Sequence, residues 1–349
     1  MISTYKRYLI GGVIAISASL VLFACGGGGG GSAGASGFQQ TYTASATVGE
    51  ILTFSVDTSA MTYSYTITKS AYGCDVSTSP CHSGSGTLTS NGDGTYSPSQ
   101  SPSSKIVALQ NGLLTGSIVL NLNNVNKTVP IVGVSNPITS VSALAGTYNF
   151  MSLQCTNKSY AVFTGCTTYN GTATVAANGT YSTCTGDNIS ANVHNCTNTT
   201  GGTLTSLGGG LWELQATTPA VGATTNYFLA FTAPNGQNVG VIDFNDSTVY
   251  GYGQAIMSTQ TATVASALSG LYAWGNDYGQ GGTVTLNANE TTSSGLTIQE
   301  NTPWTGIATV TGGTTGTGYG LIAGNGVYVY RNPNIPNEAA YFEIGLAVH

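Results

Sequence analysis

The chain has 349 residues, of which only 6% are charged, and its formal net charge is −6. Long helices need Glu, Lys and Arg, which are scarce here, whereas Thr, Val and Tyr between Gly and Asn are typical of strands. The composition therefore predicts an all-β protein. The few Lys and Arg are scattered along the chain. A nucleic-acid-binding protein needs a basic stripe against the phosphates, so nucleic acid is excluded as a partner.

The first 24 residues follow the pattern of a secretory signal peptide. Lys6 and Arg7 supply the positive start, and an uncharged, mostly apolar stretch continues to Ala24. That stretch is short for a membrane span and contains Gly11 and Gly12. We therefore expect export with cleavage rather than permanent spanning.

The signal ends in Leu22-Phe23-Ala24-Cys25, directly before six glycines. This tetrapeptide resembles the lipobox of bacterial lipoproteins, although Phe23 is bulkier than the usual residue there. The resemblance implies a diacylglyceryl group on the Cys25 sulfur, cleavage before Cys25 and acylation of its new amino group. Several acyl chains give a stable membrane anchor. In this family the residue after the lipidated cysteine directs sorting. Here it is Gly26 rather than Asp, which implies sorting to the outer membrane, with the body facing the periplasm or the cell surface.

Three β domains are expected after the anchor. Residues 1–24 form the signal peptide, and residues 25–37 hold the lipidated cysteine and a flexible Gly/Ser linker. Internal repeats divide the remainder into units at 38–137, 138–262 and 263–349.

Two repeats link the second unit to the third. The segment "SALAGTYNF" from Ser142 returns as "SALSGLYAW" from Ser266, and "GYGQAI" from Gly251 resembles "EIGLAV" from Glu343. These matches fall near the beginning and the end of each unit. They indicate that the chain is built from repeated units, with the second unit and the third as the clearest pair.

A hairpin pattern occurs once in every unit. It reads "GTLTSNGDGTYS" from Gly86, "GTATVAANGTYS" from Gly171 and "GTVTLNANETTS" from Gly282. Each copy has a strand, a polar Asn/Gly turn and a returning strand. Turn signals recur every several residues in all units, so each unit is expected to be an antiparallel sandwich or a small barrel.

Six cysteines remain when Cys25 is set aside, and an even number in an exported chain indicates disulfides. Cys74 and Cys81 are expected to close a small loop. The other four allow three pairings, of which the local pairs are preferred because each would join neighbouring strands. A zinc site needs close pairs of Cys and His ligands, and the spacings complete none, so no metal and no cofactor are expected. The preferred local pairs are Cys155–Cys166 and Cys184–Cys196.

Catalytic signals are weak. The chain has three histidines and no G-x-S-x-G motif, so a Ser-His-acid triad is not expected. Asp243 and Asp246 lie at the end of an apolar run, where they could bind Ca²⁺ or serve a hydrolase, although Asn-Asp-Ser is also ordinary turn composition. No catalytic residue is assigned, and the protein is predicted not to be an enzyme.

Aromatic residues offer candidate contacts for a ligand. Trp212, Trp274 and Trp304 stand among 20 tyrosines. In β proteins such residues are mostly core or cross-strand partners, but a few could form a stacking platform for a sugar or a groove for a peptide.

The repeated "LAGTYNF" and "LSGLYAW" resemble the G-x-W opening of calycin-type barrels such as lipocalins and avidins. Gly146 and Gly270 take the Gly position, Tyr148 and Tyr272 take the Trp position, and Trp274 comes two residues later. The resemblance implies that an aromatic side chain of the first strand plugs the barrel floor. It also implies that each later unit could enclose a small apolar ligand.

Three functions follow from the sequence. The leading hypothesis is a non-enzymatic lipoprotein of the cell envelope whose loops meet an unknown protein or glycan. The second is a small-ligand-binding barrel, which requires a cavity rather than a filled interior. The third is a secreted hydrolase, which requires Asp243 or Asp246 to meet a second carboxylate or a histidine.

Overall fold

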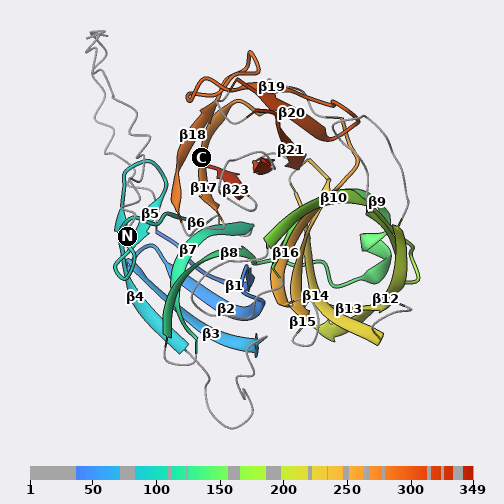
Figure 1. Ribbon diagram of the computed structural model, residues 1–349. Coiled ribbons are helices and arrows are strands. Elements are labelled where there is room, and N and C mark those ends of the chain that lie inside the picture. The colour runs from blue at the N-terminus through green and yellow to red at the C-terminus, as the bar shows by residue number, and fades with distance from the viewer. Residues whose placement is uncertain are drawn as a thin grey trace, which may run out of the picture. The chain divides into compact units, whose positions relative to one another are not determined.

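The computed structural model describes residues 37–70, 83–108, 112–122, 125–155, 166–185, 198–218, 222–233, 235–246, 251–262, 264, 268–276, 280–312, 316–323, 326–332 and 341–348. These residues are almost all in antiparallel strands, as the composition predicts. Figure 1 shows three curved sheets, coloured blue to teal, green to amber, and orange to red along the chain. Cys25, the signal peptide and the linker lie outside the described residues, apart from Gly37.

The first sheet is a closed barrel in which each strand pairs with its neighbours in the chain and β8 returns to β1. Strand β3 shows why the sequence folds this way, because Tyr63, Tyr65 and Ile67 alternate with exposed Thr and Ser. The strands are β1 Gln39–Ala46, β2 Glu50–Asp57, β3 Thr62–Ser70, β4 Ser83–Ser90, β5 Tyr96–Pro98, β6 Ile106–Ala108, β7 Leu113–Leu122 and β8 Val125–Val134.

The second sheet is also a closed barrel, which begins after a 3-10 turn and ends where β16 pairs with β9. The sandwich alternative is therefore wrong for both sheets. The elements are η1 Val141–Leu144, β9 Gly146–Cys155, β10 Cys166–Val175, β11 Thr180–Thr185, β12 Asn198–Gly208, β13 Leu211–Thr218, β14 Gly222–Thr232, β15 Asn238–Asp246 and β16 Gly251–Thr259.

The third sheet has seven strands with β18 and β19 at its edges. Isolated bridges from Thr292 to Leu286 and from Thr291 to Thr297 connect the two edges. We call this sheet the third barrel. Its strands are β17 Gly270–Asn276, β18 Gly281–Leu286, β19 Thr297–Gln299, β20 Ile307–Thr311, β21 Gly318–Ala323, β22 Val327–Asn332 and β23 Tyr341–Ala347.

The repeated hairpin has the same geometry in all three barrels. In each copy the leading glycine pairs with an aromatic residue of the preceding strand, and a Cβ added to that glycine would meet the aromatic ring. A flat ring covering a cross-strand glycine is a recurrent stabilising pair in sheets. In the first barrel the hairpin is β4–β5, two strands later in the barrel than β10–β11 in the second. The pairs are Gly86–Tyr63, Gly171–Phe150 and Gly282–Trp274.

The repeated "SALxGxY" segment forms the floor of the second and third barrels. The Tyr148 hydroxyl donates to the Leu144 carbonyl at 2.5 Å, and the Tyr272 hydroxyl donates to the Leu268 carbonyl at 2.9 Å. Both tyrosines are buried. An aromatic residue of the first strand therefore closes each floor, and the residue is tyrosine in both.

The last repeat is displaced by four residues from the match in the sequence. Thr259 pairs with Tyr148 in the second barrel, and Ala347 pairs with Tyr272 in the third. Thr259 and Ala347 are thus equivalent in the structure, whereas the sequence match aligns Ala255 with Ala347. A shift of four keeps every side chain on the same face of the sheet, so alternation alone does not reveal it.

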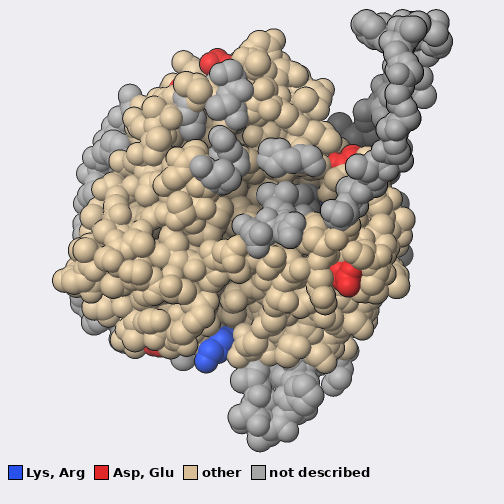
Figure 2. Space-filling view, turned by 180° about the vertical axis from the view of Figure 1, so that it is seen from behind, with Lys and Arg blue, Asp and Glu red and all other residues tan. Residues whose placement is uncertain are grey.

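Apolar residues of all three barrels, from both faces of the first sheet and from the outer faces of the other two, join in one buried cluster. Strand β21 is buried along its whole length, because its outer face contributes to this cluster and its inner face lines the third barrel. Members from the three barrels include Val132, Ile256 and Leu321. Charged side chains are few and scattered on the face drawn in Figure 2.

Candidate functional site

The candidate site lies at one end of the third barrel, inside the sheet. Directly paired residues share a face, so the pairing of Glu343 with Asn276 and Tyr330 places these three side chains in one inward-facing layer. Tyr341 and Asn332 form the next layer. We define the Glu343 cluster as Asn276, Tyr328, Tyr330, Asn332, Tyr341 and Glu343.

The carboxylate of Glu343 organises this cluster. Its Oε1 accepts a hydrogen bond from the Tyr328 hydroxyl, and its Oε2 accepts one from the Tyr341 hydroxyl at 2.5 Å. The Asn332 amide donates to the Tyr330 hydroxyl at 3.1 Å. Several polar groups are therefore held around one carboxylate.

Burial sets the electrostatics of the cluster. Desolvation raises the pKa of Glu343, and the hydrogen bonds from Tyr328 and Tyr341 oppose that rise. The pKa of Tyr328 is also raised, by burial first and by the neighbouring carboxylate second. Each charged form is disfavoured because little water reaches it. A cation placed here would stabilise the ionised carboxylate.

Aromatic rings lie flat against the wall of this barrel. A Cβ added at Gly318 would come within 2.5 Å of the Tyr330 ring, and one at Gly345 within 2.1 Å of the Tyr328 ring. Trp274 covers Gly282 in the same way. Rings held on the wall turn their other faces towards the middle of the barrel.

The two ends of the third barrel differ in polarity and exposure. Leu268, Tyr272 and Leu286 are buried at the floor, where the Tyr272 and Tyr328 rings meet edge to face at 5.4 Å. At the other end Tyr341 and Glu343 keep part of their surface in contact with solvent. The end that holds Tyr341 and Glu343 is therefore the more polar and the more exposed of the two.

The predicted tryptophans have three different environments. Trp212 is buried in the second barrel, where its indole N–H donates to the Ile138 carbonyl at 3.0 Å. Trp274 is only partly buried and lies next to the Glu343 cluster. Trp304 is partly buried against the cluster between the barrels.

Asp243 is part of strand β15 and not of a turn, which corrects the turn interpretation. It is 1% exposed, and its Oδ2 accepts a hydrogen bond from the Ser45 hydroxyl of the first barrel at 2.7 Å. Gln254, its cross-strand partner, donates to the same hydroxyl oxygen at 2.8 Å. Burial raises the pKa of Asp243 to about 8. This carboxyl therefore joins two barrels.

Asp246 ends strand β15, and its side chain lies outside the described residues. Within the described part of the chain, no three His, Cys, Asp or Glu side chains gather into a possible metal site. The described residues also contain no helix long and apolar enough to cross a membrane.

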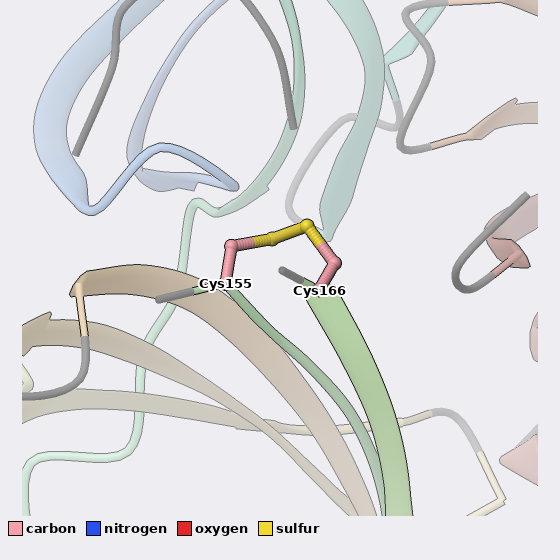
Figure 3. Close-up of a disulfide and its surroundings, with 2 residues drawn as sticks. All are labelled: Cys155 and Cys166. Carbon is pink, nitrogen blue, oxygen red and sulfur yellow. A yellow bond between two sulfur atoms is a disulfide. The ribbon is translucent and has the colours of Figure 1, made fainter. Parts of the chain in front are cut away.

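One predicted disulfide is present in the described residues. Cys155 and Cys166 are bonded at the adjacent ends of β9 and β10 (Figure 3), and they are paired residues of the ladder. Cys184 is disulfide-bonded too. Its predicted partner Cys196 lies outside the described residues, as do Cys74 and Cys81.

Comparison with known proteins does not assign this chain to a family. No protein family and no curated protein matches the sequence. Among solved structures, a protein of unknown function from the DUF3598 family of Nostoc punctiforme PCC 73102 is similar at 8% identity, with 89% of this chain and 94% of that chain covered and a TM-score of 0.16. A likeness of this size carries no argument about fold or function.

The Glu343 cluster was not singled out in the sequence. Its signal is the alternation of Tyr328, Tyr330 and Asn332 in one strand and of Tyr341 and Glu343 in another. A period of two places each set on one face of its strand. Only the pairing of β22 with β23 brings the two sets together.

Proposed function

We propose that this protein is a non-enzymatic lipoprotein of the cell envelope, anchored through Cys25, whose third barrel binds a small ligand in the manner of calycin-type barrels. The partly exposed Glu343 cluster carries the proposal. Ligand sites combine aromatic walls with a few convergent polar groups. Among the described residues, the cluster has one carboxylate and no histidine, so they do not supply the second acid that general acid–base hydrolysis would need.

The interior of the second barrel is filled by apolar side chains. Inside the second barrel Tyr148, Phe150, Trp212 and Phe228 are all buried in one apolar cluster. Because Thr259 and Ala347 are equivalent, Ala255 and Glu343 are equivalent too. Pairing across two strands leads from Ala255 to Phe228 in the second barrel. The same pairing leads from Glu343 to Gly320 in the third barrel, so Gly320 is the equivalent of Phe228. A ring fills the second barrel at a height where the third has only a hydrogen atom.

Filling the third barrel tests this function. A Cβ added at Gly320 would point inward and meet nothing closer than 3.5 Å, so Gly320→Phe should be accommodated there. We expect the wild-type protein to bind at least one of benzylamine, benzyl alcohol and benzoate in isothermal titration calorimetry. Gly320→Phe should abolish that binding, and Gly320→Ala should retain it. Binding that survives Gly320→Phe would place the ligand elsewhere.

The anchor is tested separately. Cys25→Ser removes the only thiol that the lipobox resemblance assigns to lipid attachment. We expect metabolic labelling with a radioactive fatty acid to be lost and the protein to leave the outer-membrane fraction. Labelling that is unchanged in Cys25→Ser would contradict the anchor.

A further inference from the structure

We infer that the ligand of the third barrel is a small organic cation, an amine or quaternary ammonium held between Glu343 and the surrounding aromatic rings. This inference rests on the proposed binding function and specifies its chemistry. The charges, the ring geometry and the unused acceptor capacity of the carboxylate each favour it.

The charge of the third barrel is strongly one-sided. Residues 263–349 contain five Asp or Glu and one Lys or Arg, which gives 1 − 5 = −4. The single base, Arg331, projects from the outer face, where its guanidinium donates to the Thr168 carbonyl of the second barrel at 3.2 Å. No Lys or Arg of this segment therefore neutralises Glu343 from inside the barrel. A cationic ligand would provide the missing charge.

The aromatic rings present the surface that a cation prefers. Tyr330 and Trp274 lie against glycines of the wall and are partly exposed, and Tyr341 meets Tyr330 edge to face at 5.9 Å. A cation over the face of Tyr or Trp is attracted by the ring, and the attraction is stronger where water is excluded. Several such faces surround one carboxylate here.

The Glu343 carboxylate can accept more hydrogen bonds than it receives. It accepts one from Tyr328 and one from Tyr341, whereas an ionised carboxylate has roughly four acceptor positions. The N–H groups of an ammonium ion can use the remaining positions. A neutral ligand could use them too, but would leave the negative charge of the carboxylate uncompensated.

Three probes of one size separate charge from shape. Isothermal titration calorimetry at neutral pH compares benzylamine, which is cationic, with benzyl alcohol and benzoate. We expect benzylamine to bind at least about tenfold more tightly than benzyl alcohol, because one cation–π contact and one charge pair together exceed about 1.4 kcal/mol. Benzoate should bind more weakly than either.

Two isosteric variants locate the charge that matters. Glu343→Gln should weaken benzylamine binding at least about tenfold more than it weakens benzyl alcohol binding, which removes the preference. Glu290→Gln, at an exposed turn of the same barrel, removes the same net charge and should keep the preference. If both variants weaken benzylamine equally, the general field of the barrel is responsible and the assignment to Glu343 is wrong.

The relative affinities of the wild-type protein for the three probes separate the proposal of a cationic ligand from the proposal that the barrel binds a ligand at all. Tighter binding of benzyl alcohol or benzoate, abolished by Gly320→Phe, would overturn the cation while the binding function stands. Failure of all three probes to bind would overturn both.

Discussion

The second and third barrels are built on one frame and lined differently. They share the floor tyrosine, the glycine–aromatic hairpin and the closing strand. At the height of the carboxylate, the second barrel places Ala255, Ile242 and Phe228 side by side. At the equivalent positions the third has Glu343, Tyr330 and Gly320.

The difference shows which parts of a barrel can vary. The floor and the hairpin fix strand pairing, and they are the parts that repeat. The inward-facing layers above the floor can be filled by apolar side chains, or they can contain polar side chains that form hydrogen bonds. The second barrel is filled by apolar side chains, whereas the third carries polar groups that are hydrogen-bonded to one another.

Removing the filling ring of the second barrel should produce the largest effect. Phe228→Ala leaves a cavity among buried apolar side chains and should lower the free energy of unfolding by about 3–5 kcal/mol. Gly320→Ala, at the equivalent position of the third barrel, removes no packing and should change it by less than about 0.5 kcal/mol. Urea titration followed by circular dichroism measures both. Equal losses would show that the two interiors are packed alike.

The carboxyls of Asp243 and Glu343 should respond differently to neutralisation. The folded protein keeps a proton on Asp243 up to pH about 8, whereas the unfolded chain releases it near 3.8. Stability is therefore lost as pH rises through this window, at about 1.4 kcal/mol per pH unit.

Asp243→Asn removes this dependence and should raise the free energy of unfolding at pH 7, by an amount on the order of 1–4 kcal/mol. The new amide can accept from Ser45 and donate to Gln254. Glu343→Gln, at a partly exposed position, should have a much smaller effect. Urea titrations at pH 4, 7 and 8.5 give the comparison. A wild-type stability that does not fall between pH 4 and 8 would mean that Asp243 is ionised in the folded protein.

The hairpin glycines should differ in tolerance. A Cβ at Gly171 would lie 2.0 Å from the Cys184 carbonyl oxygen, so Gly171→Ala must move backbone and should cost about 1–3 kcal/mol. At Gly282 the nearest atoms are those of the Trp274 ring at 3.0 Å, and this partly exposed side chain can shift. Gly282→Ala should therefore cost less than about 1 kcal/mol. A reversed order in thermal unfolding would contradict the contacts described.

The floor tyrosines should behave alike. Tyr148→Phe and Tyr272→Phe each remove one hydrogen bond to a carbonyl four residues earlier and should each cost about 1–2 kcal/mol. Differential scanning calorimetry of the two variants measures the cost. A clear loss in only one of them would show that the floors are not equivalent.

The sequence by itself determined the all-β class, the hairpins and the equivalence of the two floors. Each depends on local chemistry: alternation of side chains, an Asn/Gly turn, or a hydroxyl that reaches a carbonyl four residues away. Such features lie within a few residues of each other, so a pattern can reveal them.

Tertiary structure decided the closure of the sheets and the positions of the two carboxyls. Asp243 is buried by Ser45, which lies 198 residues away in the chain, and Glu343 meets Tyr328 only through the pairing of β22 with β23. A period of two says which residues share a face, but not whether that face turns inward or against another barrel. Sheet closure and barrel packing determine that choice, and they depend on contacts between residues distant in the sequence.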